Sequence, residues 1–443
     1  MSLPRYPKYK DSGVEWLGEV PEHWEILPLY GTVAERKESN KGMLEDNLLS
    51  LSYGRIVPKD ITSNDGLLPD SFETYQIVRP GDIVFRLTDL QNDKRSLRSA
   101  IVEKAGIITS AYLAVIPKRA SPNYMSYLFR SYDTTKVFYS MGGGLRQSMK
   151  FDDLKRMPTV LPPPEEQTQI AAFLDRETTK IDELVAEQRR LMALLKEKRQ
   201  AVISHAVTRG LNPNAPLKPS GIEWLGDVPK HWDVQRIKHL ARTIEQGWSP
   251  QCEGFPAEAE GEWGVLKVGC VNGGTFRSSE NKLLPPDLEP IPALAISRND
   301  LLISRANTRE LVGGAAVAER DYPTLMLCDK LYRIRFDPEQ ACPQFVSFYL
   351  GSTAVRGQIE LEATGASASM VNIGQSVIME LVMAAPPFEE QCDIVQALDR
   401  ELSKLDTLTT EAQRAINLLQ ERRTALISAA VTGQIDVRGA VAS

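Results

Sequence analysis

This chain contains the same sequence unit twice. Residues 13–25 read GVEWLGEVPEHWE and residues 221–233 read GIEWLGDVPKHWD, with nine identities in thirteen positions. A second pair follows in the same order: PPEEQTQIAAFLDRETTKID at 163–182 and PFEEQCDIVQALDRELSKLD at 387–406. The first pair is offset by 208 residues and the second by 224, so copy two carries about sixteen additional residues between these landmarks. Two copies predict a pseudo-two-fold molecule, and duplex DNA is a common two-fold partner.

The length and composition are those of an ordinary globular protein. The 443 residues leave room for two or three domains, and 42% of them are hydrophobic and 25% charged. No apolar run reaches membrane-spanning length, and the start MSLPRYPKYK lacks the apolar core of a secretory signal. We therefore expect a cytoplasmic protein without a membrane partner. The five cysteines are an odd number without a CxxC spacing, which favours reduced thiols over disulfides or a metal site.

Charge is distributed unequally between the copies. The formal net charge of −6 argues against a generally basic nucleic-acid binder. Residues 86–156, however, hold thirteen Lys or Arg against six Asp or Glu, whereas residues 296–381 of copy two hold eight against ten. If both copies contact DNA, copy one has the stronger attraction for phosphates, and copy two relies on a few placed residues. A solvated basic surface explains the same excess equally well.

Each copy consists of a body and a helical tail. Short β-type runs occur in the bodies, such as DIVFRL at 82–87 and LYRIRF at 331–336, separated by Gly, Pro, Asn and Asp. Helical segments at Asn123–Tyr132 and Cys342–Gly351 lie among them. We therefore predict mixed α/β bodies (α+β) of about 150 residues. The predicted boundaries divide the chain into a first body at 1–160, a first helix at 161–210, a second body at 211–385 and a second helix at 386–443.

The tails carry the clearest structural signal. Mostly apolar seam positions of the first tail step by threes and fours from Ile170 to His205. The same register recurs 224 residues later, which predicts two coiled-coil helices of about five heptads. Pseudo-two-fold symmetry makes their pairing antiparallel. Four charged seam positions agree, because antiparallel pairing brings Glu177 towards Arg422 and Glu401 towards Lys198. Side chains that instead turn outward to solvent remain an alternative.

The order of the repeats indicates a circular arrangement. The N-terminal KYKDSGVEWLG matches PLKPSGIEWLG, which follows the first helix, as though the N-terminus continued from the end of the second helix. We therefore expect the two chain termini to lie close together, with each body touching the ends of both helices.

These motifs together resemble the specificity (S) subunit of type I restriction–modification systems. The resemblance rests on WLGEVPEHW and WLGDVPKHW, the two EEQ helix starts, and the helix ends KRQAVISHAVTRG and RRTALISAAVTGQ, and it covers nearly the whole chain. It implies two target-recognition domains, each reading half of a split sequence in double-stranded DNA, with the antiparallel helices as a spacer. It also implies two methyltransferase (M) subunits docked on those helices, with restriction (R) subunits joining the core. The bodies vary widely in that family, so their sequence does not reveal the bases read.

DNA contacts are expected from polar loops in the bodies, because glycine lets backbone approach phosphates while Arg pairs with guanine and Gln with adenine. A solvated loop is an equally good interpretation of any one of these residues. The candidates in copy one are Lys94, Arg95, Arg98, Arg146, Gln147, Ser148 and Lys150; those in copy two are Arg305, Asn307, Thr308, Arg309, Ser367, Ser369 and Asn372.

Catalytic signatures are not found in the sequence. It contains no glycine-rich cofactor turn, no Asn/Asp-Pro-Pro-aromatic motif for a flipped base and no HExxH. His23 and His231, each beside a tryptophan in the repeated motif, are predicted to be structural. We therefore expect a non-enzymatic subunit without its own cofactor, whose partner methyltransferase binds S-adenosylmethionine. The alternative is a coiled-coil scaffold with two protein-binding heads.

Overall fold

Two long helices dominate the secondary structure: α5 spans Pro164–Arg209 and α9 spans Phe388–Val431. Each begins with two glutamates in its first turn, where negative charge favours the helix dipole. Each ends just before a glycine in the left-handed region, Gly210 or Gly433, both at φ 75°. The predicted helices, their starts and their ends are thus confirmed.

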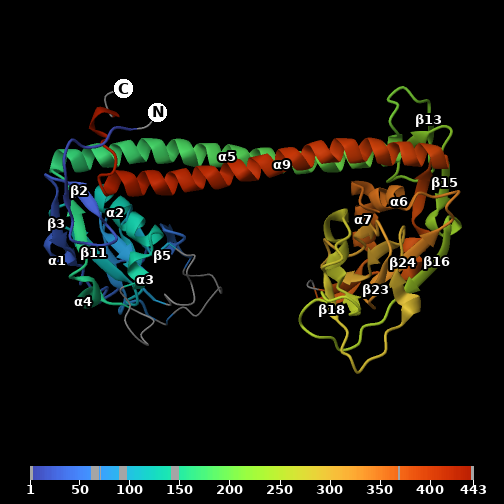
Figure 1. Cartoon of the computed structure of the whole chain (residues 1–443), viewed down its shortest axis with the longest axis horizontal. Coiled ribbons are helices and arrows are strands. Elements are labelled where there is room, and N and C mark those ends of the chain that lie inside the picture. Colours follow the sequence, from blue (N-terminus) through green and yellow to red (C-terminus); the bar gives the residue numbers. More distant parts are fainter. Residues whose placement is uncertain are drawn as a thin grey trace. The chain divides into compact units, whose positions relative to one another are not determined.

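The computed structural model describes residues 3–60, 69, 71–88, 97–140, 149–367 and 370–440. The chain forms two compact units. Unit 1 comprises Met1–Arg189 and Gln413–Ser443, and unit 2 comprises Arg190–Ala412. Each unit therefore contains one body together with the start of one long helix and the end of the other, and Figure 1 shows α5 and α9 lying side by side. None of the described helices is both long and apolar enough to cross a membrane.

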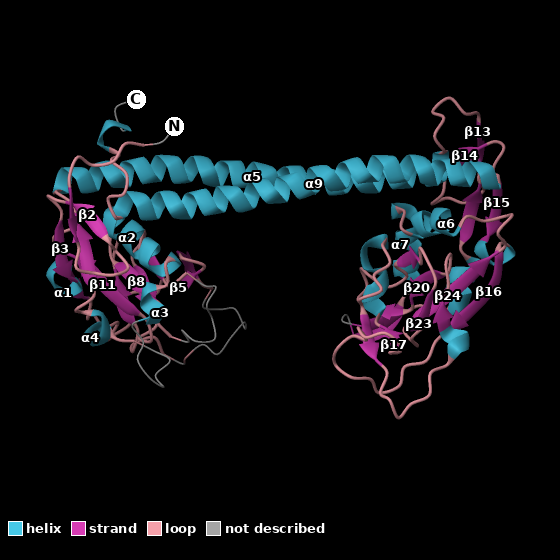
Figure 2. Cartoon of the chain, viewed as in Figure 1, coloured by secondary structure: helices cyan, strands magenta, loops and turns pink. Residues whose placement is uncertain are grey.

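The body of unit 1 is built on a four-stranded antiparallel sheet in the order β4-β11-β8-β9. Helix α2, Pro122–Thr134, packs against its edge strand β9. Figure 2 shows the helices and strands of this body in separate colours. Strand pairs β1-β2, β3-β12, β5-β6 and β7-β10 complete the body. The strands are β1 Tyr9–Asp11, β2 Glu19–Pro21, β3 Glu25–Pro28, β4 Val33–Glu35, β5 Leu49–Ser52, β6 Arg55–Pro58, β7 Gln76–Val78, β8 Ile83–Phe85, β9 Ser99–Ile101, β10 Gly106–Ile108, β11 Leu113–Pro117 and β12 Pro158–Leu161; the short helices are α1 Leu29–Thr32, α3 Val137–Ser140 and α4 Phe151–Leu154.

The body of unit 2 repeats this plan with an addition. Its antiparallel sheet has the order β16-β24-β20-β22, and helix α6 packs against the edge strand β22. A mixed sheet β18-β17-β23-β19, a small sheet β21-β26-β25 and the pairs β13-β14 and β15-β27 complete the unit. The strands are β13 Leu217–Pro219, β14 Asp227–Pro229, β15 Asp233–Arg236, β16 Ala241–Gln246, β17 Gly264–Leu266, β18 Asn281–Leu283, β19 Ala295–Ile296, β20 Leu301–Ser304, β21 Ala306–Asn307, β22 Ala315–Val317, β23 Tyr322–Met326, β24 Leu331–Phe336, β25 Thr364–Ser367, β26 Met370–Asn372 and β27 Val382–Ala385; the helices are α6 Pro343–Leu350, α7 Thr353–Glu362 and α8 Gln375–Glu380.

The main core of each unit joins the body to the helix pair. In unit 1, Phe85 and Phe129 of the body belong to the same buried cluster as Leu174 of α5 and Ile427 of α9. The corresponding cluster of unit 2 combines body residues with the end of α5 and the start of α9. Burying the apolar stripes of the helices against the bodies stabilises both. The mixed α/β bodies and the paired helices predicted from the sequence are confirmed.

The helix pair is antiparallel in each unit, but its register differs from the prediction by one residue at alternate positions. In unit 1, Ile181 and Val185 are buried, whereas the predicted seam residue Leu184 is 51% exposed. In unit 2, Leu402 is buried, whereas the predicted Glu401 is exposed. The step from Ile181 to the next seam residue is four residues, to Val185, whereas the prediction had three, to Leu184. Leu184 lies at the edge of the apolar stripe, so the sequence pattern is compatible with either order.

This shift corrects the predicted charge pairs. Glu177 pairs with its own-helix neighbours, with Lys180 at 3.0 Å, and Glu401 pairs with Lys404. Lys198 acts on Glu401 only as one of several nearby charges that lower its pKa, after the hydrogen bond from Lys404. No ion pair joins Glu177 to Arg422 among the described residues.

Other charged residues form the ion pairs between α5 and α9. In unit 1, Arg423 of α9 donates to Asp182 of α5 at 3.0 Å. In unit 2, Arg199 of α5 donates to Asp406 of α9 at 2.5 Å. The four residues are two equivalent pairs, because 182 and 406, like 199 and 423, differ by the repeat offset of 224. The antiparallel charge complementarity is therefore present, with the basic residues one position and the acidic residues five positions beyond the predicted ones.

The described segments next to the two chain termini meet in unit 1, as the circular order of the repeats predicts (Figure 1). The backbone N–H of Asp436 donates to the carbonyl of Pro4 at 2.8 Å, and the hydroxyl of Tyr9 donates to the carbonyl of Gly433 at 2.9 Å. The side chain of Gln434 donates to the carbonyl of Glu19. The N-terminal segment therefore packs on the end of α9.

Candidate nucleic-acid interface

The repeated His-Trp motif anchors each body to the first turn of a long helix. In unit 1, Glu166 accepts a hydrogen bond from Nε1 of Trp24 at 2.9 Å, and its other carboxylate oxygen lies 2.7 Å from Nε2 of His23. In unit 2, Glu390 contacts Trp232 at 3.1 Å and His231 at 2.8 Å. The structural role predicted for both histidines is confirmed.

Unit 1 adds further partners to this anchor. Tyr6 donates to Glu166, and Arg438 lies 3.5 Å from the same carboxylate and stacks over the Tyr6 ring. Burial and the nearby Glu166 raise the pKa of Tyr6, while the hydrogen bond from Arg438 lowers the pKa of Asp436. The residues just beyond α9 thus bind the N-terminal segment without a covalent link.

The glutamine that follows each anchor glutamate joins the long helix to the body. Gln167 donates to the carbonyl of Pro162 and accepts from the backbone N–H of Ser121, just before α2. Gln391 donates to the carbonyl of Pro386 and accepts from the N–H of Cys342, just before α6. From the sequence alone, the EEQ repeat predicted only the start of a helix. Its role as an anchor could have been inferred from its invariant pairing with HW in both copies.

Most DNA-binding candidates of copy one lie outside the described residues: Lys94, Arg95, Arg146, Gln147 and Ser148. Lys150 is exposed, and its backbone N–H donates to the carboxylate of Asp153 at 2.8 Å. The assignment of Arg98 to DNA is wrong. Its side chain is fully buried, donates to the carbonyl of Thr88 and to the hydroxyl of Tyr139, and lies over the Tyr139 ring. The charge was visible in the sequence, but its burial was not.

The two candidate loops of copy two meet in space, although about sixty residues separate them in the sequence. Ala306 and Asn307 form β21, which pairs antiparallel with β26, and β26 pairs in turn with β25. Asn372 therefore stands between Ala306 on one side and Thr364 on the other. Ser369 lies outside the described residues, and for Ser367 only the backbone is described.

The remaining candidates of unit 2 differ in what their side chains contact. Arg305 donates to the carbonyl of Asp329 at 3.3 Å, and Arg309 donates to the carbonyl of Glu360 at 2.9 Å. Asn307 accepts from the N–H of Thr308 at 2.9 Å, and its NH₂ group makes two long contacts of 3.4 Å. Three of the four side chains thus support the local backbone, while that of Thr308 is exposed.

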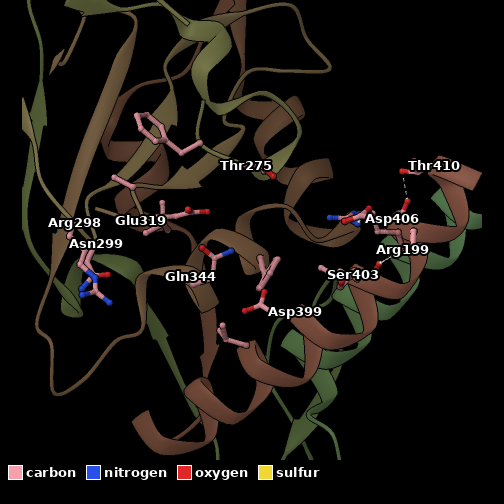
Figure 3. A pocket seen from close by; sticks show the side chains of 18 of the residues that line it. Arg199, Thr275, Arg298, Asn299, Glu319, Gln344, Asp399, Ser403, Asp406 and Thr410 are labelled. Atoms are coloured by element: carbon pink, nitrogen blue, oxygen red, sulfur yellow. Dashed lines mark hydrogen bonds and ion pairs between the residues drawn. The ribbon is translucent and has the colours of Figure 1, made fainter. Parts of the chain in front are cut away.

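Each unit also has an open polar cleft where its body meets the helix pair. The cleft of unit 2 measures about 800 Å³, and Figure 3 shows Asp399, Ser403 and Asp406 of α9 lining it, with Gln344 of α6 nearby. Burial raises the pKa of Asp399. The cleft of unit 1, about 890 Å³, is lined by Asp175, which lies 224 residues before Asp399. Four carboxylates against two arginines line the cleft of unit 2 and repel phosphate, so in that unit the loops are the better candidates for contact with DNA.

Comparison with known proteins gives the class. No family model matches the chain. Over 223 residues it is 28% identical to the type I restriction enzyme EcoEI specificity subunit of Escherichia coli, a match covering 50% of this chain and 38% of that relative. Over 438 residues it is 23% identical to the putative type I restriction enzyme MjaX specificity subunit of Methanocaldococcus jannaschii, covering 95% and 96% of the two chains. The EcoKI specificity subunit of Escherichia coli K12 is 22% identical, covering 94% and 90%.

Solved structures agree on the fold. A chain from a structure of the type I R-M system superposes with a TM-score of 0.68 at 18% identity, over 93% of this chain and 98% of that one. The HsdS subunit from Thermoanaerobacter tengcongensis gives a TM-score of 0.52 at 18% identity, over 94% and 98%. The protein therefore has the fold of these subunits. It is a homologue of type I restriction enzyme specificity subunits.

Proposed function

We propose that this chain is the DNA sequence-recognition subunit of a type I restriction–modification complex. Each body reads one half of a bipartite site, and the helix pair sets the distance between the halves. One observation carries this proposal. The chain is a homologue of specificity subunits, and each of its two units holds one body that is anchored to a long helix in the same way. The chain directs partner methyltransferase subunits, which bind S-adenosylmethionine, to adenines in that site, and restriction subunits join the complex.

The helix pair offers a surface for those methyltransferase subunits. Leu184 and Leu418 in unit 1, and Leu191, Leu194 and Leu408 in unit 2, are between 40% and 55% exposed. Exposed leucines on long helices are typical of a protein-binding surface. Binding both a protein partner and DNA distinguishes the proposal from a scaffold that binds proteins alone.

A salt-dependent gel shift tests the function. The chain with its methyltransferase partner should retard a duplex carrying its bipartite site, and the affinity should fall steeply as salt rises because phosphate contacts release counterions. A scaffold would bind the methyltransferase but not the duplex. Failure of the complex to select any duplex over random DNA would refute sequence recognition.

The spacer role predicts a defined change when the helices are lengthened. Seven residues inserted after Arg189 in α5, with seven inserted before Gln413 in α9, keep the antiparallel seam in register. At about 1.5 Å per residue they add roughly 10 Å, which corresponds to about three base pairs at about 3.4 Å each. The spacer in the methylated motif should lengthen by that amount while the half-site bases stay the same. An unchanged spacer with intact folding would contradict the role of the helices.

A further inference from the structure

The small sheet β21-β26-β25 of unit 2 presents one face to the core and the other away from it. Val371 and Ile373 are buried in the main core cluster, and the hydroxyl of Tyr332 donates to the carbonyl of Ile373 at 3.1 Å. Side chains alternate along a strand, so Met370 and Asn372 point to the opposite face. Met370 is 46% exposed and Asn372 is half-buried. The ribbon is thus rooted in the core on one side, and on the other side Met370 is exposed while Asn372 is half-buried.

The face opposite the core carries one polar pair, Thr364 and Asn372, and the third strand adds Ala306, which is only 3% exposed. Thr364 of β25 stands opposite Asn372 on one side, and Ala306 of β21 stands opposite it on the other with only a methyl group. Thr364 is exposed, and the Asn372 amide makes no hydrogen bond with any residue that the structure describes. A half-buried amide with both its donor and acceptor unused is available to a ligand.

Gly365 keeps the two strands of this ribbon close together. A Cβ atom at this position would lie 2.7 Å from the carbonyl oxygen of Met370 and 3.0 Å from Cα of Val371. A larger residue would therefore push β25 away from β26 and displace Thr364 from Asn372. The glycine therefore keeps Thr364 beside Asn372.

We propose that the β25–β26 ribbon is the base-reading element of unit 2, and that Asn372 reads an adenine in the major groove of its half-site. The major groove admits a two-stranded β-ribbon, and the asparagine amide pairs with the N6 and N7 atoms of adenine. This inference rests on the proposed function and adds the element, the residue and the base. Arg305, Arg309 and Asn307 act as positioning residues, since their side chains hold the neighbouring backbone.

The test compares the wild-type chain and Asn372→Ala, each in complex with the cognate methyltransferase subunits. Duplexes carry the bipartite site with one base pair changed at a time, and competition binding measures the preference for the correct base at each position. Asn372→Ala should lose a factor of about 5 to 150 in discrimination at one A·T pair of the half-site read by unit 2. Preferences in the other half-site, and affinity for random DNA, should not change.

Three further variants separate this inference from a general loss of structure. Asn214→Ala removes the same amide from an exposed turn outside the ribbon and should leave every preference unchanged. Asn372→Asp keeps the size of the side chain but cannot donate to N7, so it should lose the same discrimination. Gly365→Ala should weaken discrimination across the whole half-site by separating the strands.

The outcomes assign failures to different claims. If the wild type selects its site and Asn372→Ala still discriminates fully at every position, Asn372 does not read a base. Equal loss on specific and random DNA also overturns this reading role, because that pattern belongs to a phosphate contact. A wild-type complex that selects no duplex would instead refute the proposed function itself.

Discussion

Replacing Glu166 with alanine should lower the free energy of unfolding of unit 1 by about 3 kcal/mol. The side chain of Glu166 is only 10% exposed and accepts hydrogen bonds from Trp24 and Tyr6, both buried. Removing the carboxylate leaves those donors without their acceptor, and hydrogen bonds to charged groups contribute about 1.5–3 kcal/mol each. For a unit of this size, thermal unfolding should occur about 6–12 °C lower.

The neighbouring glutamates provide the controls for this prediction. Glu165→Ala, in the same helical turn but exposed, loses only a favourable charge near the helix dipole and should lower the unfolding temperature by less than about 4 °C. Glu390→Ala should cost less than Glu166→Ala, because the Glu390 side chain is 31% exposed and binds two partners instead of four. Equal unfolding temperatures for Glu165→Ala and Glu166→Ala would show that the carboxylate is no anchor.

Arg98→Ala should destabilise unit 1 by about 3 kcal/mol, without a selective loss of DNA binding in the protein that remains folded. The fully buried guanidinium donates to the carbonyl of Thr88 at 2.9 Å and contacts Tyr139. Truncation removes this support and leaves a cavity in the core. Denaturant unfolding measures the loss of stability, and gel shifts below the unfolding temperature measure affinity per folded molecule.

Lys150→Ala is the matched change at an exposed cation of the same unit. It should leave stability unchanged and, if the loop contacts phosphate, should weaken specific and random DNA alike. If Arg98→Ala keeps wild-type stability but loses affinity for DNA, Arg98 contacts DNA, and its burial is contradicted.

The overall plan of the fold could be predicted because it is encoded in patterns repeated at a distance. Two copies of HW, 208 residues apart, and two of EEQ, 224 residues apart, indicated two equivalent units, and the helix bounds followed from acidic first turns and terminal glycines. The finer register could not be predicted in the same way. Leu184 and Val185 both suit a seam, and only packing against the partner helix decides that Val185 is buried.

The candidate site was only partly predictable. Polar loops identified the segments that form β21, β25 and β26, but no local pattern revealed that these segments pair with one another. Arg98 was misassigned because a cation in a basic stretch has the same sequence signal whether it faces solvent or donates to a buried carbonyl. Long-range contacts, absent from any sequence window, decide both cases.

Sequencing methylated adenines tests the central claim most directly. The measurement compares cells that express the methyltransferase subunits with this chain and cells that express them with a chain whose residues 30–160 come from a relative. We predict a bipartite motif in the first case, and in the second a motif with one half-site changed and the other half-site and the spacer preserved. Methylation that does not depend on this chain, or an exchange that alters both half-sites, would contradict recognition by two separate bodies.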